Sequence, residues 1–497
     1  MEYLYEKLTA YGNSDYYAFH MPGHKRNMEL MRARLPYNID ITEIDGFDDL
    51  HHAEELLKEL QENAARVFHA EETHYLVNGS TVGLLSAVMG CTHRGDKILV
   101  ARHCHKSIYH AIYMNGLVPR YVYPEFDISM HMNGEISKED VAKALAAEPD
   151  IKAVVIVSPN YDGVVSDVKG IAEVAHSYRI PLIVDEAHGA HFHFPNYFPA
   201  SAAELGADLV IQSFHKTLPA MTQTAVLHNC SDRVDSRLIR RFMGIYQTSS
   251  PSYILIASME NCVRYMAEKG AGEMARYGAR LRELREKLAK LKHFRLLKEE
   301  ICGAAGVYGY DPSKLVLFPD FMTGTRLAEV LRTEYHLEAE MSSGRYVLLM
   351  TSFMDTEEGF SRLERALLEL DARVEKLEAE SVGLKDAKQG RQEPFSEEQL
   401  NRKPNQENDS ENYPQQMCLP WQAWHGDGML VPLEEAEGRV ARTCVTIYPP
   451  GVPMLMPGER IGTREIARIR EDWKLGLTVE GICEKSDKLN LWIEVVI

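Results

Sequence analysis

Between about Glu54 and Leu227 the sequence alternates between strand-like and helix-like segments, and this alternation restricts the fold more than any other feature. The strand-like segments are short apolar runs: DKILVA, VPRYVYP, KAVVIVSPN, IPLIVDEAH and ADLVIQSFH. Segments with apolar residues at helical spacing separate several of them, as in SKEDVAKALAAE and VKGIAEVAHSY. This order predicts an α/β fold with a mainly parallel sheet covered by helices. In such sheets the chemistry takes place at the carboxyl ends of the strands.

The rest of the chain predicts two smaller regions. A long helical pattern covers about Pro251 to Lys292, and KLVLFPD, a helix near Thr325–Tyr335, RYVLLMTS and a helix to about Glu380 indicate a smaller α+β domain. Residues 379–416 contain few apolar side chains and are predicted to form a polar linker. The segment that follows regains apolar and strand-like runs, which predicts a small C-terminal domain.

Composition excludes several classes of protein. The 497 residues carry a net charge of -18, which disfavours a nucleic-acid partner and suits a cationic substrate, although many acidic proteins are acidic only for solubility. No apolar run is long enough to cross a membrane, and the first residues lack the pattern of a secretory signal. The 8 cysteines are scattered without a Cys-x-x-Cys pair, which favours reduced thiols and a cytoplasmic location.

The stretch VDEAHGAHFHF, Val184–Phe194, has three interpretations. The letters DEAH also occur in nucleic-acid motors, but a motor needs a phosphate-binding loop that contains Gly-Lys, and this dipeptide is absent from the sequence. Asp185, His188, His191 and His193 are possible metal ligands. On a strand they would point to opposite sides, and on a helix His193 would leave the common face. We therefore predict no metal site here and expect pocket or structural histidines.

A third interpretation gives Asp185 a partner in Lys216. Lys216 follows a strand-like run and lies between Ser213, His215 and Thr217. A partly buried lysine loses its proton more readily, and a neutral amine reacts with an aldehyde cofactor. A carboxylate facing a pyridine nitrogen keeps that nitrogen protonated, which makes the ring an electron sink. The stretch NGSTVGLLSAVMG predicts a turn into a helix whose N-terminus suits the cofactor's phosphate, and Ser213 and His215 can add donors.

Eight short motifs occur in one order over nearly the full chain. They are FHMPGHK (Phe19–Lys25), DDLHH (Asp48–His52), NGST (Asn78–Thr81), CHKS (Cys104–Ser107), DEAHGAH (Asp185–His191), SFHK (Ser213–Lys216), TSSPSY (Thr248–Tyr253) and YPPGVPMLMPGE (Tyr448–Glu459). Each is weak by itself, but the set resembles the bacterial ornithine/lysine/arginine decarboxylases, which are fold type I enzymes that use pyridoxal 5′-phosphate (PLP). The chain is similar to the short form of that family, which lacks an N-terminal wing domain.

The resemblance implies three catalytic residues. Lys216 matches the Schiff-base lysine, Asp185 matches the partner of the pyridine nitrogen, and His105 matches the imidazole stacked over one face of the ring. Ala187 matches the small residue packed on the other face. The alternatives are a surface lysine at Lys216 and a packed core histidine at His105. His188 departs from the aromatic residue that several long-form members carry near this position.

Further cofactor contacts are implied by the same resemblance. The matching phosphate contacts within one chain are Ser80, Thr81, Ser213 and His215. Thr248 and Ser250 match contacts that a second subunit makes, which implies a homodimer or a higher homo-oligomer with shared active sites. Their alternative role is to cap a helix before Pro251. YPPGVPMLMPGE is either the family's C-terminal motif or only a turn-rich domain edge.

The resemblance also predicts the domain order and the reaction. The predicted parts are an N-terminal arm (1–53), a PLP-binding major domain (54–265), a small α+β domain (266–378), the linker (379–416) and a C-terminal domain (417–497). The implied activity is the PLP-dependent decarboxylation of arginine, lysine or ornithine to agmatine, cadaverine or putrescine. The rivals are an aminotransferase, an acyl-transferring synthase and a non-catalytic PLP-binding assembly protein. SFHK, CHKS and YPPGVP favour the decarboxylase, and no nucleic-acid or membrane partner is expected.

Overall fold

The computed structural model describes residues 3–17, 20–22, 24–26, 35–127, 130, 132–194, 197–303, 306–381, 413–448, 451–484 and 491–497. Parts of three predicted features lie outside the described residues: 382–412 of the linker, Phe19 and Gly23 of FHMPGHK, and Pro449 and Pro450 of YPPGVPMLMPGE. The chain forms two compact units. The first comprises Met1–His93, Leu145–Pro159 and Val168–Ala275, and the second comprises Arg94–Ala144, Asn160–Asp167 and Arg276–Ile497.

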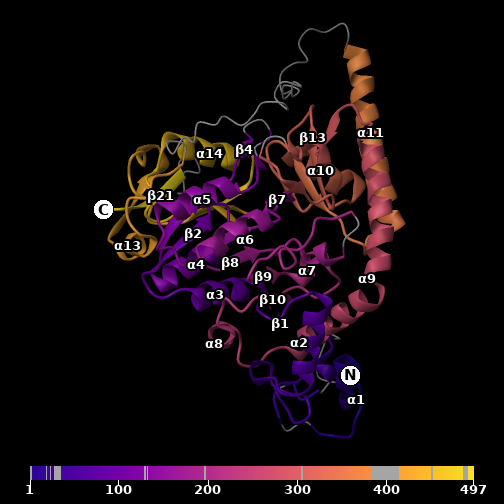
Figure 1. Ribbon diagram of the computed structural model, residues 1–497. Coiled ribbons are helices and arrows are strands. Elements are labelled where there is room, and N and C mark those ends of the chain that lie inside the picture. The colour runs from indigo at the N-terminus through magenta and orange to yellow at the C-terminus, as the bar shows by residue number, and fades with distance from the viewer. Residues whose placement is uncertain are drawn as a thin grey trace. The chain divides into compact units, whose positions relative to one another are not determined.

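The first unit is built on five neighbouring strands. They are β1 (Glu72–Leu76), β6 (Val154–Val157), β8 (Leu182–Asp185), β9 (Leu209–Gln212) and β10 (Ala225–Asn229). Their order is β1-β10-β9-β8-β6, and the first four of these strands are labelled in Figure 1. Strands β6, β8 and β9 are parallel, whereas β10 is antiparallel to β9 and to β1. The parallel part confirms the prediction from the apolar runs, and every residue of β8, β9 and β10 is buried.

The parallel pairing of β8 with β9 positions the two central motifs. Asp185 is the last residue of β8 and pairs with Ile211 near the end of β9. DEAH and SFHK therefore begin at the same edge of the sheet, as predicted. SFHK continues into a short helix, α7 (Phe214–Thr217), which carries Lys216.

Helices of the first unit follow the predicted periodicity. They are α1 (Leu4–Gly12), α2 (Leu56–Val67), α3 (Gly79–Cys91), α6 (Val168–Ser177), α8 (Ser236–Tyr246) and the first part of α9 (Tyr253–Leu288), with 3-10 turns η1 (Tyr37–Ile39), η2 (Leu50–His52) and η3 (Ala190–His193). In α2 the buried residues include Leu57, Leu60 and Ala64, which recur at helical spacing. Gly79 begins α3 with φ of +74°, a left-handed conformation that glycine adopts at little cost.

The second unit contains a parallel strand pair and a small sheet. β2 (Lys97–Ala101) and β3 (Val118–Val122) are parallel and connected by α4 (Lys106–Asn115). The sheet has the order β11-β13-β15-β14, formed by β11 (Phe294–Leu296), β13 (Lys314–Pro319), β15 (Val347–Met350) and β14 (Met341–Ser342). The helices α10 (Gly324–Tyr335) and α11 (Glu357–Ser381) follow β13 and β15 along the chain. Short elements are β4 (Phe126–Asp127), β5 (Met132–Asn133), α5 (Lys138–Ala147), β7 (Val164–Val165), η4 (Glu299–Ile301) and β12 (Gly309–Tyr310).

The C-terminal segment of the second unit has two three-stranded sheets around one core. The orders are β16-β21-β20 and β18-β17-β19. The elements are α13 (Pro420–His425), β16 (Gly428–Pro432), η6 (Leu433–Glu435), β17 (Val445–Tyr448), β18 (Val452–Leu455), α14 (Thr463–Lys474), β19 (Thr478–Glu480), β20 (Ile482–Glu484) and β21 (Leu491–Val496). Leu433, Ala436, Val445, Ile461 and Ile493 are fully buried in this core.

A buried ion pair joins the end of β2 to this C-terminal segment. Arg102 is 6% exposed and Glu459 is 1% exposed. Arg102 Nη2 lies 2.8 Å from Glu459 Oε2, and Nε lies 3.2 Å from Oε1, so the pair is bidentate. Arg102 Nη1 also donates to the carbonyl of Pro453 at 2.7 Å, and Glu459 accepts from the backbone N–H of Met456 at 2.7 Å.

Candidate active site

Asp185 lies at the carboxyl end of β8 and is only 3% exposed. Its Oδ1 accepts a hydrogen bond from the backbone N–H of Ala187 at 3.1 Å. Burial raises the pKa of Asp185, while the positive charge of Lys216 and the Ala187 N–H act in the opposite direction. A buried carboxylate next to a cationic group is suited to stabilise a positive charge on a bound ring.

Lys216 is half-buried on α7 and contacts a histidine of the DEAH motif. Its Nζ lies 3.0 Å from His188 Nε2. His188 is 6% exposed, so the ring faces Nζ from within the core. The sequence left the role of His188 open, and the structure places this residue next to Lys216. Lys216, His188 and Asp185 therefore form one cluster at the edge of the sheet.

Three hydrogen bonds, one between backbone groups and two between a side chain and the backbone, connect the predicted phosphate-binding segments. Gly79 N donates to the carbonyl of Gln223 at 2.9 Å, and the ring of His215 lies 2.9 Å from the carbonyl of Thr224. Thr248 N donates to Asn78 Oδ1 at 3.1 Å. The start of α3, the loop between β9 and β10, and the segment before α9 therefore meet near α7.

The start of α3 has the properties of an anion site. Asn78 precedes the helix, but its side chain makes no capping hydrogen bond to the helix. Ser80 and Thr81 occupy the first turn, where backbone N–H groups have no helical acceptor. Ser213 is fully buried, and within the described part of the chain its Oγ has no hydrogen-bond partner. Ser213 Oγ can therefore donate a hydrogen bond to an anion bound at this helix start.

His215 and His105 are each held in a fixed orientation. Burial lowers the pKa of His215, and nearby Lys216 lowers it further, which favours a neutral ring. His105 belongs to the second unit, where it precedes α4 and its Nδ1 accepts from the backbone N–H of Ser107 at 3.3 Å. The same Nδ1 lies 2.9 Å from Ser107 Oγ. His105 therefore caps α4, which restrains its ring.

Thr248 and Ser250 are exposed in the segment before α9. The carbonyl of Thr248 lies 2.7 Å from His51 Nε2 of the DDLHH motif. The helix begins at Tyr253. Ser252 Oγ caps its first turn by accepting a hydrogen bond from Leu255 N at 3.5 Å. Neither Thr248 nor Ser250 makes this capping bond.

A buried polar network next to Asp185 was not predicted from the sequence. Glu186 is 1% exposed and accepts from Ala202 N at 2.7 Å, Ser201 Oγ at 2.7 Å and Gln212 Nε2 at 2.6 Å. Burial raises the pKa of Glu186 to about 8, in spite of these donors. No local pattern signals this network, because its members come from three separate segments. His193 adjoins it through Ser201 and Gln212.

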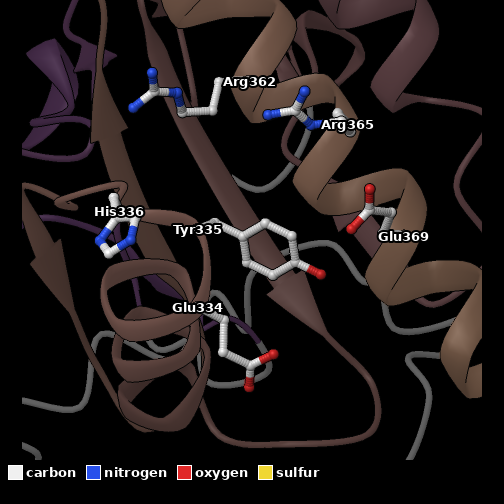
Figure 2. Close-up of a pocket in the computed structure, with 6 residues that line it drawn as sticks. All are labelled: Glu334, Tyr335, His336, Arg362, Arg365 and Glu369. Carbon is white, nitrogen blue, oxygen red and sulfur yellow. The ribbon is translucent and has the colours of Figure 1, made fainter.

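A pocket of the second unit is lined by charged side chains and contains none of the predicted site residues. Figure 2 shows its lining: Glu334, Tyr335, His336, Arg362, Arg365 and Glu369. The first three lie at the end of α10 and the others lie on α11.

Among the described residues no helix has both the length and the apolar character needed to cross a bilayer.

Comparison with known protein families identifies the chain's relatives. The model of the Orn/Lys/Arg decarboxylase major domain matches residues 3–316, and the model of the C-terminal domain of the same enzymes matches residues 406–470. The chain belongs to the Orn/Lys/Arg decarboxylase family. This membership confirms the resemblance inferred from the eight motifs.

Individual members of the family match over almost the full chain. An arginine decarboxylase of Halalkalibacterium halodurans is 32% identical over 96% of this chain and 94% of its own length. An arginine decarboxylase of Bacillus subtilis is 31% identical over 96% and 95%. The lysine decarboxylase of Francisella novicida superposes with a TM-score of 0.82 at 21% identity, covering 100% of this chain and 81% of that one. These matches confirm the predicted fold type I architecture of a decarboxylase.

An acyl-transferring synthase, one of the rival classes, superposes on a smaller part of this chain. The serine palmitoyltransferase of Sphingomonas wittichii superposes with a TM-score of 0.50 at 16% identity, over 64% of this chain and 77% of that one. Similarity at this level concerns the fold alone. The superposition therefore shows a shared fold and does not support acyl transfer as the reaction of this chain.

Proposed function

We propose that the chain is a PLP-dependent arginine decarboxylase, which converts arginine into agmatine and carbon dioxide. The observation that carries the proposal is the cluster of Lys216, His188 and Asp185 at the joined ends of β8 and β9. Family membership supports decarboxylation of a basic amino acid. The relatives named arginine decarboxylase, at 30–32% identity, support arginine within that class.

The residues present fit the pyridine nitrogen, the aldehyde and the phosphate of PLP. Asp185 would hold the pyridine nitrogen, Lys216 the aldehyde carbon and Ala187 one face of the ring, and the family resemblance assigns the other face to His105. The phosphate would bind to the residues at the start of α3 and on α7, namely Ser80, Thr81, Ser213 and His215. The buried Ser213 Oγ, which has no partner among the described residues, is available to donate to this phosphate. When bound, PLP supplies an electron sink for the bond that breaks at the α-carbon.

Three side chains, Asp185, His188 and Lys216, can hold or transfer protons next to bound PLP. Buried Asp185 stabilises a proton on the pyridine nitrogen through its negative charge. His188 Nε2, at 3.0 Å, can accept a proton from Lys216 Nζ and so leave the amine neutral for bond formation. After carbon dioxide has left, Lys216 or His188 can return a proton to the substrate's α-carbon. The acidic surface, with a net charge of -18, attracts a cationic substrate.

Product analysis tests the function directly. With arginine, lysine and ornithine offered together at equal concentration, we expect agmatine and carbon dioxide as the main products of the PLP-loaded protein. Cadaverine or putrescine as the main product would contradict arginine as the substrate. Formation of a keto acid without carbon dioxide would contradict decarboxylation and favour an aminotransferase.

We further propose that the working unit is a homodimer or a larger assembly in which Thr248 and Ser250 of one chain complete the phosphate site of its neighbour. A phosphate dianion needs several donors, and these two hydroxyl residues are exposed. Lys216→Ala and Thr248→Ala/Ser250→Ala should each be inactive, and a mixture of the two should regain part of the activity. In a mixed dimer with shared sites, one site carries neither substitution.

The mixing experiment separates shared sites from self-contained ones. Thr248 N contacts Asn78 of its own chain, so a contribution within one chain is the competing arrangement. In that arrangement every site of the mixed dimer retains one defect, and no activity returns. Ser249→Ala, in the same exposed segment, is the control and should need no complementation. Absence of recovery despite demonstrated subunit exchange would contradict the shared site.

A further inference from the structure

A second group of side chains, separate from the cluster around Lys216, has the composition and spacing of a metal site. It is the one such group among the described residues. One ligand atom each from His69, His193 and Glu204 lies within 4.8 Å of the other two. His69 comes from the turn between α2 and β1, His193 ends η3, and Glu204 precedes β9. Two imidazoles and one carboxylate are the protein ligands of several zinc sites that keep an open position.

His193 supplies the second sign of a missing ligand. It is 4% exposed, and its Nε2 lies 3.0 Å from Ser201 Oγ and 2.9 Å from Gln212 Nε2. Its Nδ1 is also buried, yet among the described residues it has no hydrogen-bond partner. Because Nε2 already has two polar neighbours, Nδ1 is the atom left to bind a ligand.

The surroundings of His193 suit a metal-bound ring. A metal on Nδ1 requires the proton on Nε2, which Ser201 Oγ can accept while it donates to Glu186 at 2.7 Å, and the Gln212 amide then has to turn its oxygen towards this nitrogen. Hydrogen bonds from the second ring nitrogen orient histidine ligands in this way.

His69 and Glu204 can adjust to a metal ion because they reach the site from the surface. Their side chains are 60% and 31% exposed, and Nδ1 of His69 lies 2.5 Å from Oε1 of Glu204. Metal bonds of about 2.0–2.2 Å hold two ligands farther apart than this. Metal binding would therefore replace the direct hydrogen bond between the two side chains, and both have room to rotate.

We infer that His69, His193 and Glu204 form a site for a divalent transition-metal ion of the zinc class, with water at the open position. Two nitrogen ligands favour such an ion over Mg²⁺ or Ca²⁺, which prefer oxygen. The site differs from the one weighed in the sequence, where His193 was grouped with Asp185, His188 and His191. An ion here would tie together the turn before β1, η3 and the segment before β9. The inference does not depend on the proposed decarboxylase activity.

Zinc titration of the metal-depleted holoenzyme tests the site, with bound zinc and thermal unfolding as readouts. We expect one zinc ion per chain and a higher melting temperature, because an ion that binds only the folded state stabilises it. Mg²⁺ at the same concentration should produce no such rise. His69→Ala and Glu204→Gln each remove one exposed ligand, so both variants should fold and bind zinc at least about tenfold more weakly.

His52→Ala is the matched control for these variants. His52 Nδ1 lies 3.1 Å from Asp49 Oδ2, with side chains 83% and 41% exposed, but this histidine–carboxylate pair belongs to no group of three ligands among the described residues. It should bind zinc as the unmodified protein does. Equal zinc affinity in the unmodified protein and both ligand variants overturns the inference. So does an unmodified protein without stoichiometric zinc, or a control that loses as much affinity as the ligand variants.

Discussion

Lys216→Ala should lower arginine decarboxylation by at least about 10³-fold, because it removes both the amine that binds the cofactor aldehyde and a proton donor. The loss should be accompanied by loss of the cofactor that borohydride fixes to the chain. Peptide mapping of the reduced holoenzyme provides the measurement, and the modified peptide should contain Lys216. The surrounding fold should persist, since α7 is short and Lys216 is only half-buried.

Two further variants sharpen the test of Lys216. Lys216→Arg keeps the positive charge next to Asp185 but cannot bind the aldehyde, so it should be as inactive as the alanine variant. Lys143→Ala changes a lysine that is 68% exposed and should retain both activity and cofactor. Cofactor fixed to a lysine other than Lys216 in the unmodified protein would contradict the assignment.

Asp185→Asn should retain the cofactor but lose turnover by about 10²–10³-fold, the usual size of removing one preorganised charge. The amide has nearly the shape of the carboxyl group, so Ala187 and the end of β8 should remain in place. It carries no negative charge to hold a proton on the pyridine nitrogen, and the ring becomes a poorer electron sink. The measurement is kcat for arginine together with the cofactor content of the purified variant.

The neighbouring carboxyl group provides the matched control for Asp185. Glu186 is equally buried and burial raises its pKa to about 8, but its carboxyl oxygens accept from Ala202, Ser201 and Gln212. Glu186→Gln should therefore cost stability through its hydrogen bonds to Ser201 and Gln212, while most of the turnover remains. An Asp185→Asn variant with near-normal turnover, or a Glu186→Gln variant that loses just as much, would contradict the role of Asp185.

Local periodicity was sufficient to predict most elements of the chain. DKILVA forms β2, KAVVIVSPN forms β6, and the long helical pattern forms α9 within about two to four residues of the predicted ends. The antiparallel strands β1 and β10 were not predicted. Strand direction depends on pairing between distant residues, such as Thr73 with His228, and no local pattern records it.

The candidate site was predictable only in part for the same reason. Asp185 and Lys216 each stand at the end of an apolar run, and parallel pairing of those runs implies that the two residues are neighbours. The contact between His188 and Lys216 depends on how the chain turns after β8, which periodicity does not describe. The group of His69, His193 and Glu204 could not be predicted either, because its members are far apart in the sequence.

The ion pair of Arg102 and Glu459 limits how this chain can be divided or recombined. Family models treat residues 3–316 and 406–470 as separate domains, yet Arg102 lies in the first range and Glu459 in the second. Replacing Glu459 by a residue without a carboxylate would leave a buried guanidinium unpaired, which costs about 3–5 kcal/mol when one partner is lost. A chimera therefore has to keep an arginine and a glutamate at these two positions, although 357 positions separate them in the chain.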